Sequence, residues 1–174
     1  RIFIKGKIAR VWEELTKIDS PQGAVYNAMM HRTRDGAGAA FRMRSADGRH
    51  TMVLGEIIEW EPLKRFAHTF QMTMYMDPPC IVRYELIERD GGVDVTMTLE
   101  RLPQGTKTAK EMMQGAKFIL GNLQSLIETG KPPFKTRLMY AIFAKTGFVL
   151  PKRLRSEHWP LREPSADDIA KNER

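Results

Sequence analysis

The middle of the chain alternates apolar and polar residues with the two-residue period of β-strands. Between Phe66 and Met76 every second residue is phenylalanine, methionine or histidine, and between Val93 and Leu99 large apolar residues alternate with aspartate and threonine. This alternation predicts strands with one buried face. Shorter strand patterns are separated by turn sequences such as Asp47–Gly48 and Asp90–Gly92. We therefore expect an antiparallel sheet of six to seven strands.

A long helix is predicted after the last strand. Apolar residues recur at spacings of three and four from Met112 to Ile127, and Thr108 with Glu111 forms a capping box that marks the start. Gly130 marks the end, so the helix measures about 33 Å. Since the sheet and the helix each have one apolar face, we predict an α+β fold. The sheet curls around the C-terminal helix and leaves a cavity between them.

Three stretches of the chain carry motifs of a known superfamily. Val11–Thr16 reads VWEELT, Gly55–Phe70 reads GEIIEWEPLKRFAHTF, and Gly115–Gly130 ends in ETG. In this order they resemble the START-like, or SRPBCC, superfamily, in the branch similar to the C-terminal domain of the activator of the heat-shock-protein-90 ATPase. The resemblance covers residues 1–130 and implies the helix-grip fold of the major birch pollen allergen.

The resemblance implies a ligand cavity, and the alternation indicates which residues form its wall. Two of them, Phe70 and Ala116, stand where the superfamily usually has tryptophan. The cavity of this chain is therefore not expected to have the shape that is usual in the superfamily. Methionine is flexible and suits varied apolar shapes, although core filling is the alternative for each one. The predicted wall consists of Phe41, Met43, Phe66, His68, Phe70, Met72, Met74, Val82, Tyr84, Met97, Met112, Ala116, Ile119 and Leu120.

Two polar residues are candidates for chemistry. His68 lies among the apolar residues of the predicted inner face, where it could bind a ligand or act as a general base. The alternative that we favour is a neutral core histidine. Glu59 shares the strand side of Ile57, and on the cavity side it would be a buried acid or base. The favoured alternative is an ion pair with a nearby arginine, Arg42, Arg44 or Arg65.

The positive charge is concentrated after the helix. The chain has 28 basic and 21 acidic residues, of which eight basic residues and one acid, Glu157, lie in 131–162. That segment therefore carries +7, and the remainder is balanced. We predict two parts: a helix-grip domain at 1–130 and a basic, partly apolar extension at 131–174.

The extension contains many large apolar residues, and leaving all of them exposed to water would be unfavourable. They are Phe134, Leu138, Met139, Ile142, Phe143, Phe148 and Leu150. Packing on the outer face of the sheet, a homodimer, or an anionic membrane surface would each bury them. The strand at 51–60 is apolar on both sides and could cover these residues, which favours packing on the sheet or a homodimer. Nucleic acid is not an expected partner, because no base-stacking platform or reading motif is present.

Composition and motifs exclude several classes of function. The four histidines and the single cysteine, Cys80, lack metal-ligand spacing, and no phosphate loop, dinucleotide fingerprint or nucleophile elbow occurs. We therefore expect no metal and no cofactor. One cysteine excludes an internal disulfide, and no basic-then-apolar signal precedes the first strand, so a cytoplasmic protein is expected.

Three functions fit these observations. The first is binding of a small hydrophobic, lipid-like or polyketide-like ligand in the cavity, without catalysis. The second, which the resemblance implies, is an enzyme of the polyketide cyclase or aromatase kind, with His68 and Glu59 converging in the cavity. The third is a co-chaperone that activates the heat-shock-protein-90 ATPase. It ranks last because such activators carry an additional N-terminal domain that residues 1–174 do not include.

Overall fold

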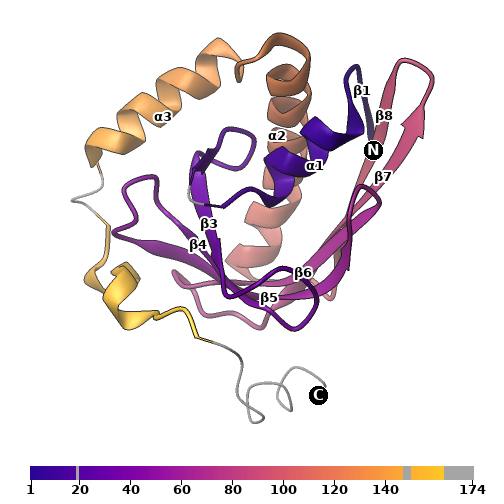
Figure 1. The fold of residues 1–174 in the computed structure, drawn as a ribbon. Coiled ribbons are helices and arrows are strands. Elements are labelled where there is room, and N and C mark those ends of the chain that lie inside the picture. Colours follow the sequence, from indigo (N-terminus) through magenta and orange to yellow (C-terminus); the bar gives the residue numbers. More distant parts are fainter. Residues whose placement is uncertain (19, 147–149, 163–174) are drawn as a thin grey trace.

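The computed structural model describes residues 1–18, 20–146 and 150–162. An eight-stranded antiparallel sheet with the order β1-β8-β7-β6-β5-β4-β3-β2 curls around a long helix (Figure 1). The strands are β1 (Ile2–Ile4), β2 (Pro21–Gln22), β3 (Ala28–Arg32), β4 (Ala40–Arg44), β5 (Thr51–Glu61), β6 (Arg65–Met72), β7 (Cys80–Arg89) and β8 (Gly92–Glu100). The helices are α1 (Ile8–Thr16), α2 (Lys107–Thr129), α3 (Phe134–Thr146) and the 3-10 turns η2 (Lys152–Leu154) and η3 (Ser156–His158).

The predicted helix-grip architecture is confirmed, with eight strands instead of six or seven. The additional strand is β2, whose two residues are too few to produce an alternating pattern. A second difference concerns the strand predicted to reach Met76. Strand β6 ends at Met72, and Met76 is 45% exposed in the following turn with a φ of 56°.

Helix α2 has well-defined ends. Its N-cap is Thr106, whose hydroxyl accepts a hydrogen bond from the Ala109 amide at 3.2 Å. The capping box predicted at Thr108 was therefore two residues late. The helix stops at Gly130, whose φ of 80° lies in the left-handed region, and the Gly130 amide donates to the Leu126 carbonyl at 2.9 Å.

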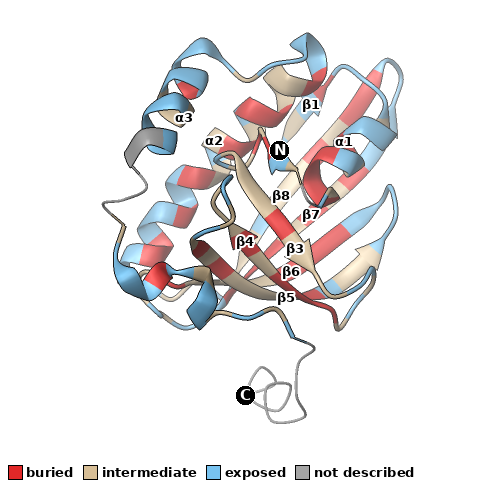
Figure 2. Cartoon of the chain, turned by 60° about the vertical axis from the view of Figure 1, so that its left-hand side comes forward, coloured by how far each residue is buried: buried red, intermediate tan, exposed pale blue. Residues whose placement is uncertain are grey.

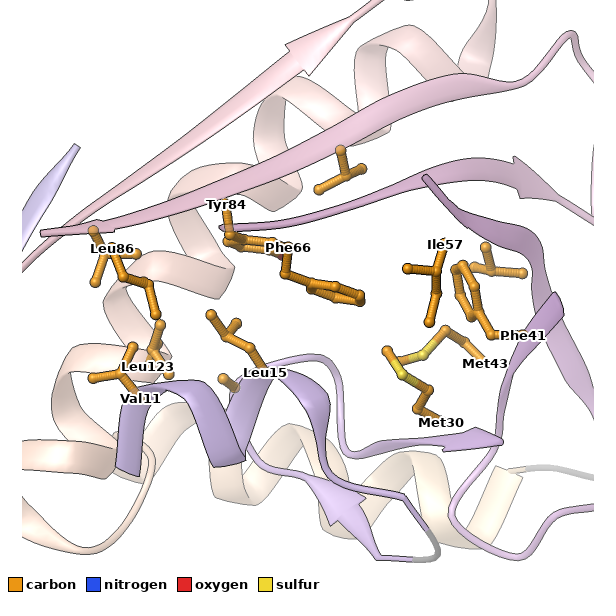
Figure 3. Close-up of a cluster of buried hydrophobic side chains, with 14 of the residues drawn as sticks. Val11, Leu15, Met30, Phe41, Met43, Ile57, Phe66, Tyr84, Leu86 and Leu123 are labelled. Carbon is orange, nitrogen blue, oxygen red and sulfur yellow. The ribbon is translucent and has the colours of Figure 1, made fainter. Parts of the chain in front are cut away.

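The core lies between the inner face of the sheet and the two helices α1 and α2. Figure 3 shows Val11 of α1 and Leu123 of α2 beside Leu86 of β7, and all three are buried. The tryptophan of the VWEELT motif, Trp12, meets the Trp60 ring edge-on at 5.2 Å. This contact packs α1 against the sheet at β5.

The described part of the extension contacts the domain through α3 and through the segment that follows α3. Helix α3 leads away from the end of α2, and the segment after it returns beside β4 and β5 (Figure 1). In that returning segment Leu154 is fully buried, and the Ser156 amide donates to the Arg49 carbonyl at 2.9 Å. The predicted extension reached residue 174 and included Phe148. That residue and residues 163–174 lie outside the described part of the chain.

Candidate ligand cavity

A cavity of about 1100 Å³ lies between the inner face of the sheet and α2. Strands β3 to β8 form its floor, α2 forms one wall, and α3 contributes to its rim. Most of its lining is apolar. Seven of the chain's eleven methionines line it: Met30, Met43, Met52, Met72, Met74, Met97 and Met112. This lining can adapt its shape, because methionine side chains are unbranched and flexible.

The structure brings most of the predicted wall residues together around this cavity. Those that line it are Met43, Phe66, His68, Phe70, Met72, Met74, Val82, Tyr84, Met97, Met112, Ala116 and Ile119. Among them are Phe70 and Ala116, the two positions where the resembling superfamily usually has tryptophan. Each smaller side chain leaves space that an indole would occupy.

Two predicted wall residues, Phe41 and Leu120, are not part of the lining. The ring of Phe41 covers Gly55 on the neighbouring strand, where a Cβ atom would lie 2.1 Å from the ring carbon Cε1. Only glycine fits there, and Phe41 is fully buried as a result. Leu120 is half-buried and packs against the core.

His68 is a buried polar group on the cavity floor. It is 7% exposed and lies among three phenylalanine rings, with Phe41 edge-on at 4.7 Å and Phe66 at 5.2 Å. Burial lowers the pKa of His68 from 6.5 to about 4, and a hydrogen bond to the Thr69 carbonyl opposes that shift only in part. The ring is therefore neutral at physiological pH.

The tautomer of His68 follows from its backbone hydrogen bond. Its Nδ1 lies 2.9 Å from the Thr69 carbonyl oxygen, which can only accept, so Nδ1 carries the proton. The other ring nitrogen, Nε2, is then an acceptor. A ligand hydroxyl or amide N–H is the group that this nitrogen would bind.

Tyr84 is a second polar group on the same floor. In the register of β6 and β7, His68 pairs with Val82 and Phe66 with Tyr84, so His68 and Tyr84 are diagonal neighbours roughly 7–8 Å apart. Tyr84 is 5% exposed, and within the described part of the chain no hydrogen-bond partner is present for its hydroxyl. Burial raises the pKa of Tyr84, so the phenol stays protonated and can donate.

Glu59 lies outside the cavity. A register shift between Ile57 and Glu59 breaks the alternation of β5, so Ile57 and Trp60 face the core and Glu59 does not. Its carboxylate forms an ion pair with Arg83 and lies 3.9 Å from Arg65. His68 and Glu59 therefore do not converge on one site.

No pattern in the sequence indicated that the extension contributes to this site. Tyr140, Phe143 and Ala144 of α3 line the cavity, as does Leu150 beyond it. Packing on the outer face of the sheet and a homodimer were the two arrangements that we favoured for these residues. A helix that is apolar on both sides has no period that tells which side packs inward.

The described residues show neither a metal centre nor a membrane-spanning element. No group of three or more histidine, cysteine or acidic side chains in that part of the chain is arranged to bind a metal ion. None of the helices described is long and apolar enough to cross a bilayer. Cys80 is buried, and its burial raises the thiol pKa to about 11, so it is not a reactive thiolate.

Comparison with known proteins gives one family and several similar folds. The family model described as "Activator of Hsp90 ATPase homolog 1-like protein" matches residues 5–128. No sequence among curated proteins matches the chain significantly.

Several solved structures share the fold. DynU16, a protein of the dynemicin biosynthetic locus, is 21% identical with a TM-score of 0.61; the match covers 75% of this chain and 46% of that one. CalU16 from Micromonospora echinospora is 17% identical, with 86% of each chain covered and a TM-score of 0.54. The Aha1 dimer from Colwellia psychrerythraea is 16% identical, covering 75% of this chain and 94% of that one, with a TM-score of 0.52. The chain thus spans less than half the length of DynU16, and these identities establish a shared fold.

Proposed function

The chain belongs to the family of Activator of Hsp90 ATPase homolog 1-like proteins, and from that premise we propose that it binds a small, uncharged, largely apolar ligand between its sheet and α2. The observation that carries the proposal is the cavity of about 1100 Å³ with its mainly apolar lining. Protein interiors are close-packed and contain few voids larger than a water molecule. A cavity of this size is slightly larger than most ligand sites, so packing alone does not account for it.

The charges around the cavity disfavour an anionic ligand, since Asp47 and Glu111 are the acidic residues of its described lining. Among the described residues no lysine or arginine lines it, so a ligand carboxylate or phosphate would lack a cationic partner. His68 does not supply one, because its pKa of about 4 keeps the ring neutral. Burying an unpaired charge against this lining would be costly.

The polar groups of the floor favour a ligand with a hydroxyl group. Nε2 of His68 accepts a hydrogen bond, and the Tyr84 hydroxyl can donate one. A ligand hydroxyl both donates and accepts, so one such group can satisfy either partner. Long-chain alcohols, sterol-like molecules and phenolic polycycles all combine an apolar body with this group.

The enzymatic alternative has less support. It required His68 and Glu59 to converge, and Glu59 is ion-paired with Arg83 outside the cavity. The co-chaperone alternative has the family name as its support and no feature of the described residues. We therefore retain ligand binding without a catalytic role.

The proposal predicts saturable binding of an uncharged fluorescent probe such as Nile red. Replacing Ala116 with tryptophan should fill part of the cavity and weaken this binding at least tenfold, a loss of about 1.4 kcal/mol. Met113→Trp is the matched control, because Met113 lies on the same helix and is 57% exposed, away from the cavity. Absence of saturable binding to the unaltered protein, or equal binding by both variants, would refute the proposal.

A further inference from the structure

Helix α3 carries an exposed apolar stripe along its outer side. Phe134 is 73% exposed, Leu138 53% and Ile142 52%. Their spacing of four residues places them on one face of the helix, over about 12 Å. Figure 2 shows α3 as exposed over most of its length, in contrast to the buried positions along α2.

The opposite side of α3 faces the protein. The Thr136 hydroxyl donates to Asn122 Oδ1 of α2 at 2.9 Å, and the Tyr140 hydroxyl donates to the Gly23 carbonyl at 3.0 Å. Tyr140 and Phe143 also line the cavity, and Phe143 is 53% exposed at its rim. Helix α3 therefore lies between the rim of the cavity and any partner that binds the exposed stripe of the helix.

The charges near the stripe distinguish between candidate partners. Lys135 and Arg137 lie on the same helix as the stripe, Lys131 precedes it, and all three are exposed. In 131–162 the single acid is Glu157, which is paired with Arg155. A second copy meeting this face about a twofold axis would bring these like charges together. An anionic surface would be attracted to them.

We propose that α3 lies on an anionic membrane surface, with the stripe Phe134–Leu138–Ile142 inserted at the boundary between head groups and acyl chains. Exposed lysine and arginine are attracted to anionic head groups, and apolar side chains beside them can then be buried at the membrane interface. Docking in this way places the rim of the cavity next to the lipid. The consequence that the cavity exchanges its ligand with the membrane rests on the proposed function, whereas docking itself does not.

Docking is tested by flotation of the full chain with vesicles of phosphatidylcholine that contain about one third phosphatidylserine. We expect binding to these vesicles, little binding to pure phosphatidylcholine, and release at about 1 M salt, where the Debye length is about 3 Å. The double variant Phe134→Ser/Leu138→Ser should bind at least tenfold more weakly. Lys135→Glu/Arg137→Glu should also lose binding, with a smaller salt dependence.

A matched control uses exposed apolar residues elsewhere. Met113→Ser/Ile87→Ser removes two residues that are 57% and 51% exposed on α2 and β7, and it should bind vesicles like the unaltered protein. Sedimentation velocity on the stripe variant gives the second readout. Failure of the unaltered protein to bind vesicles would refute the proposal. So would a dimer that the stripe variant converts to a monomer, since the stripe would then be an interface between copies.

The two proposals fail separately. Nile red titration without vesicles reports the cavity alone, and the stripe variant should keep full binding there. Vesicle binding with no dye binding would refute the ligand proposal and leave docking intact. Dye binding with no vesicle binding would refute docking and leave the ligand proposal intact.

Discussion

Helices α2 and α3 follow one another in the chain but differ in how their apolar residues are used. Helix α2 has 23 residues, is capped at both ends, and buries one stripe that includes Met112, Ile119 and Leu123. Helix α3 has 13 residues and is attached through Thr136 and Tyr140, while Phe134 and Leu138 stay in solvent. One helix has a single apolar face and the other has two.

This difference separates residues that stabilise the fold from residues that remain available for a partner. A buried stripe gains free energy from folding itself, at roughly 1.5–3 kcal/mol for each large side chain. A half-exposed stripe gains less from folding, and the apolar area that it leaves in solvent remains for a later contact. The stability of the domain should therefore depend on α2, and α3 should matter for what the domain binds.

Equal truncations in the two helices should show the largest contrast. Leu123→Ala removes a fully buried side chain of α2 and should lower the free energy of unfolding by about 2–5 kcal/mol. Leu138→Ala in α3 removes a side chain that is 53% exposed and should change it by less than about 0.5 kcal/mol. Urea denaturation of both variants measures the difference. Similar losses would mean that α3 is part of the core and that the contrast is wrong.

The cavity floor opposite α2 should make stability depend on pH through His68. Its pKa is about 4 in the folded protein and 6.5 when exposed, so below pH 6.5 the unfolded chain binds more protons than the folded one. Stability should therefore fall as pH drops from about 6.5 to about 4, by roughly 3 kcal/mol in total, and this contribution should be constant below that range.

His68→Phe should remove this pH dependence, because phenylalanine keeps a planar ring and has no proton to bind. The control is His158→Phe, which makes the same substitution at an imidazole that is 54% exposed. His68→Phe should also weaken displacement of Nile red by a long-chain alcohol. If the variant keeps both the pH dependence and the alcohol affinity, His68 has neither role.

The sequence predicted the grip because one-sided burial produces a regular pattern. Strand alternation and the stripe of α2 each result from a face packed against the core, and that cause extends over many residues. Features set by one or two residues were not predictable. The register shift after Ile57 turns Glu59 outward, and β2 is two residues long.

The candidate site was predictable in its floor and not in its rim. His68, Phe70 and Met72 follow the alternation of β6, so their common side could be read from the sequence. Whether that side meets packed core or a cavity depends on how far α2 stands from the sheet, which no periodicity records. Phe41 illustrates this. It lies on the inward-facing side of its strand, as the alternation predicts, but its ring packs over Gly55 and does not line the cavity.

The smallest predicted effect concerns the attachment of α3. Tyr140→Phe removes the hydrogen bond to the Gly23 carbonyl and leaves the aromatic ring in place. We expect a loss of about 1 kcal/mol or less in unfolding free energy.

Release of bound Nile red from Tyr140→Phe should become faster, since Tyr140 lies at the rim of the cavity. Stopped-flow dilution measures that rate. Tyr75→Phe is the control, because Tyr75 also lines the cavity and this change removes its hydrogen bond to Glu111 at 2.6 Å while leaving α3 attached. If Tyr140→Phe and Tyr75→Phe release the dye at the same rate as the unaltered protein, α3 does not limit access to the cavity. Faster release from Tyr140→Phe alone, with stability nearly unchanged, would assign α3 to exchange and α2 to folding.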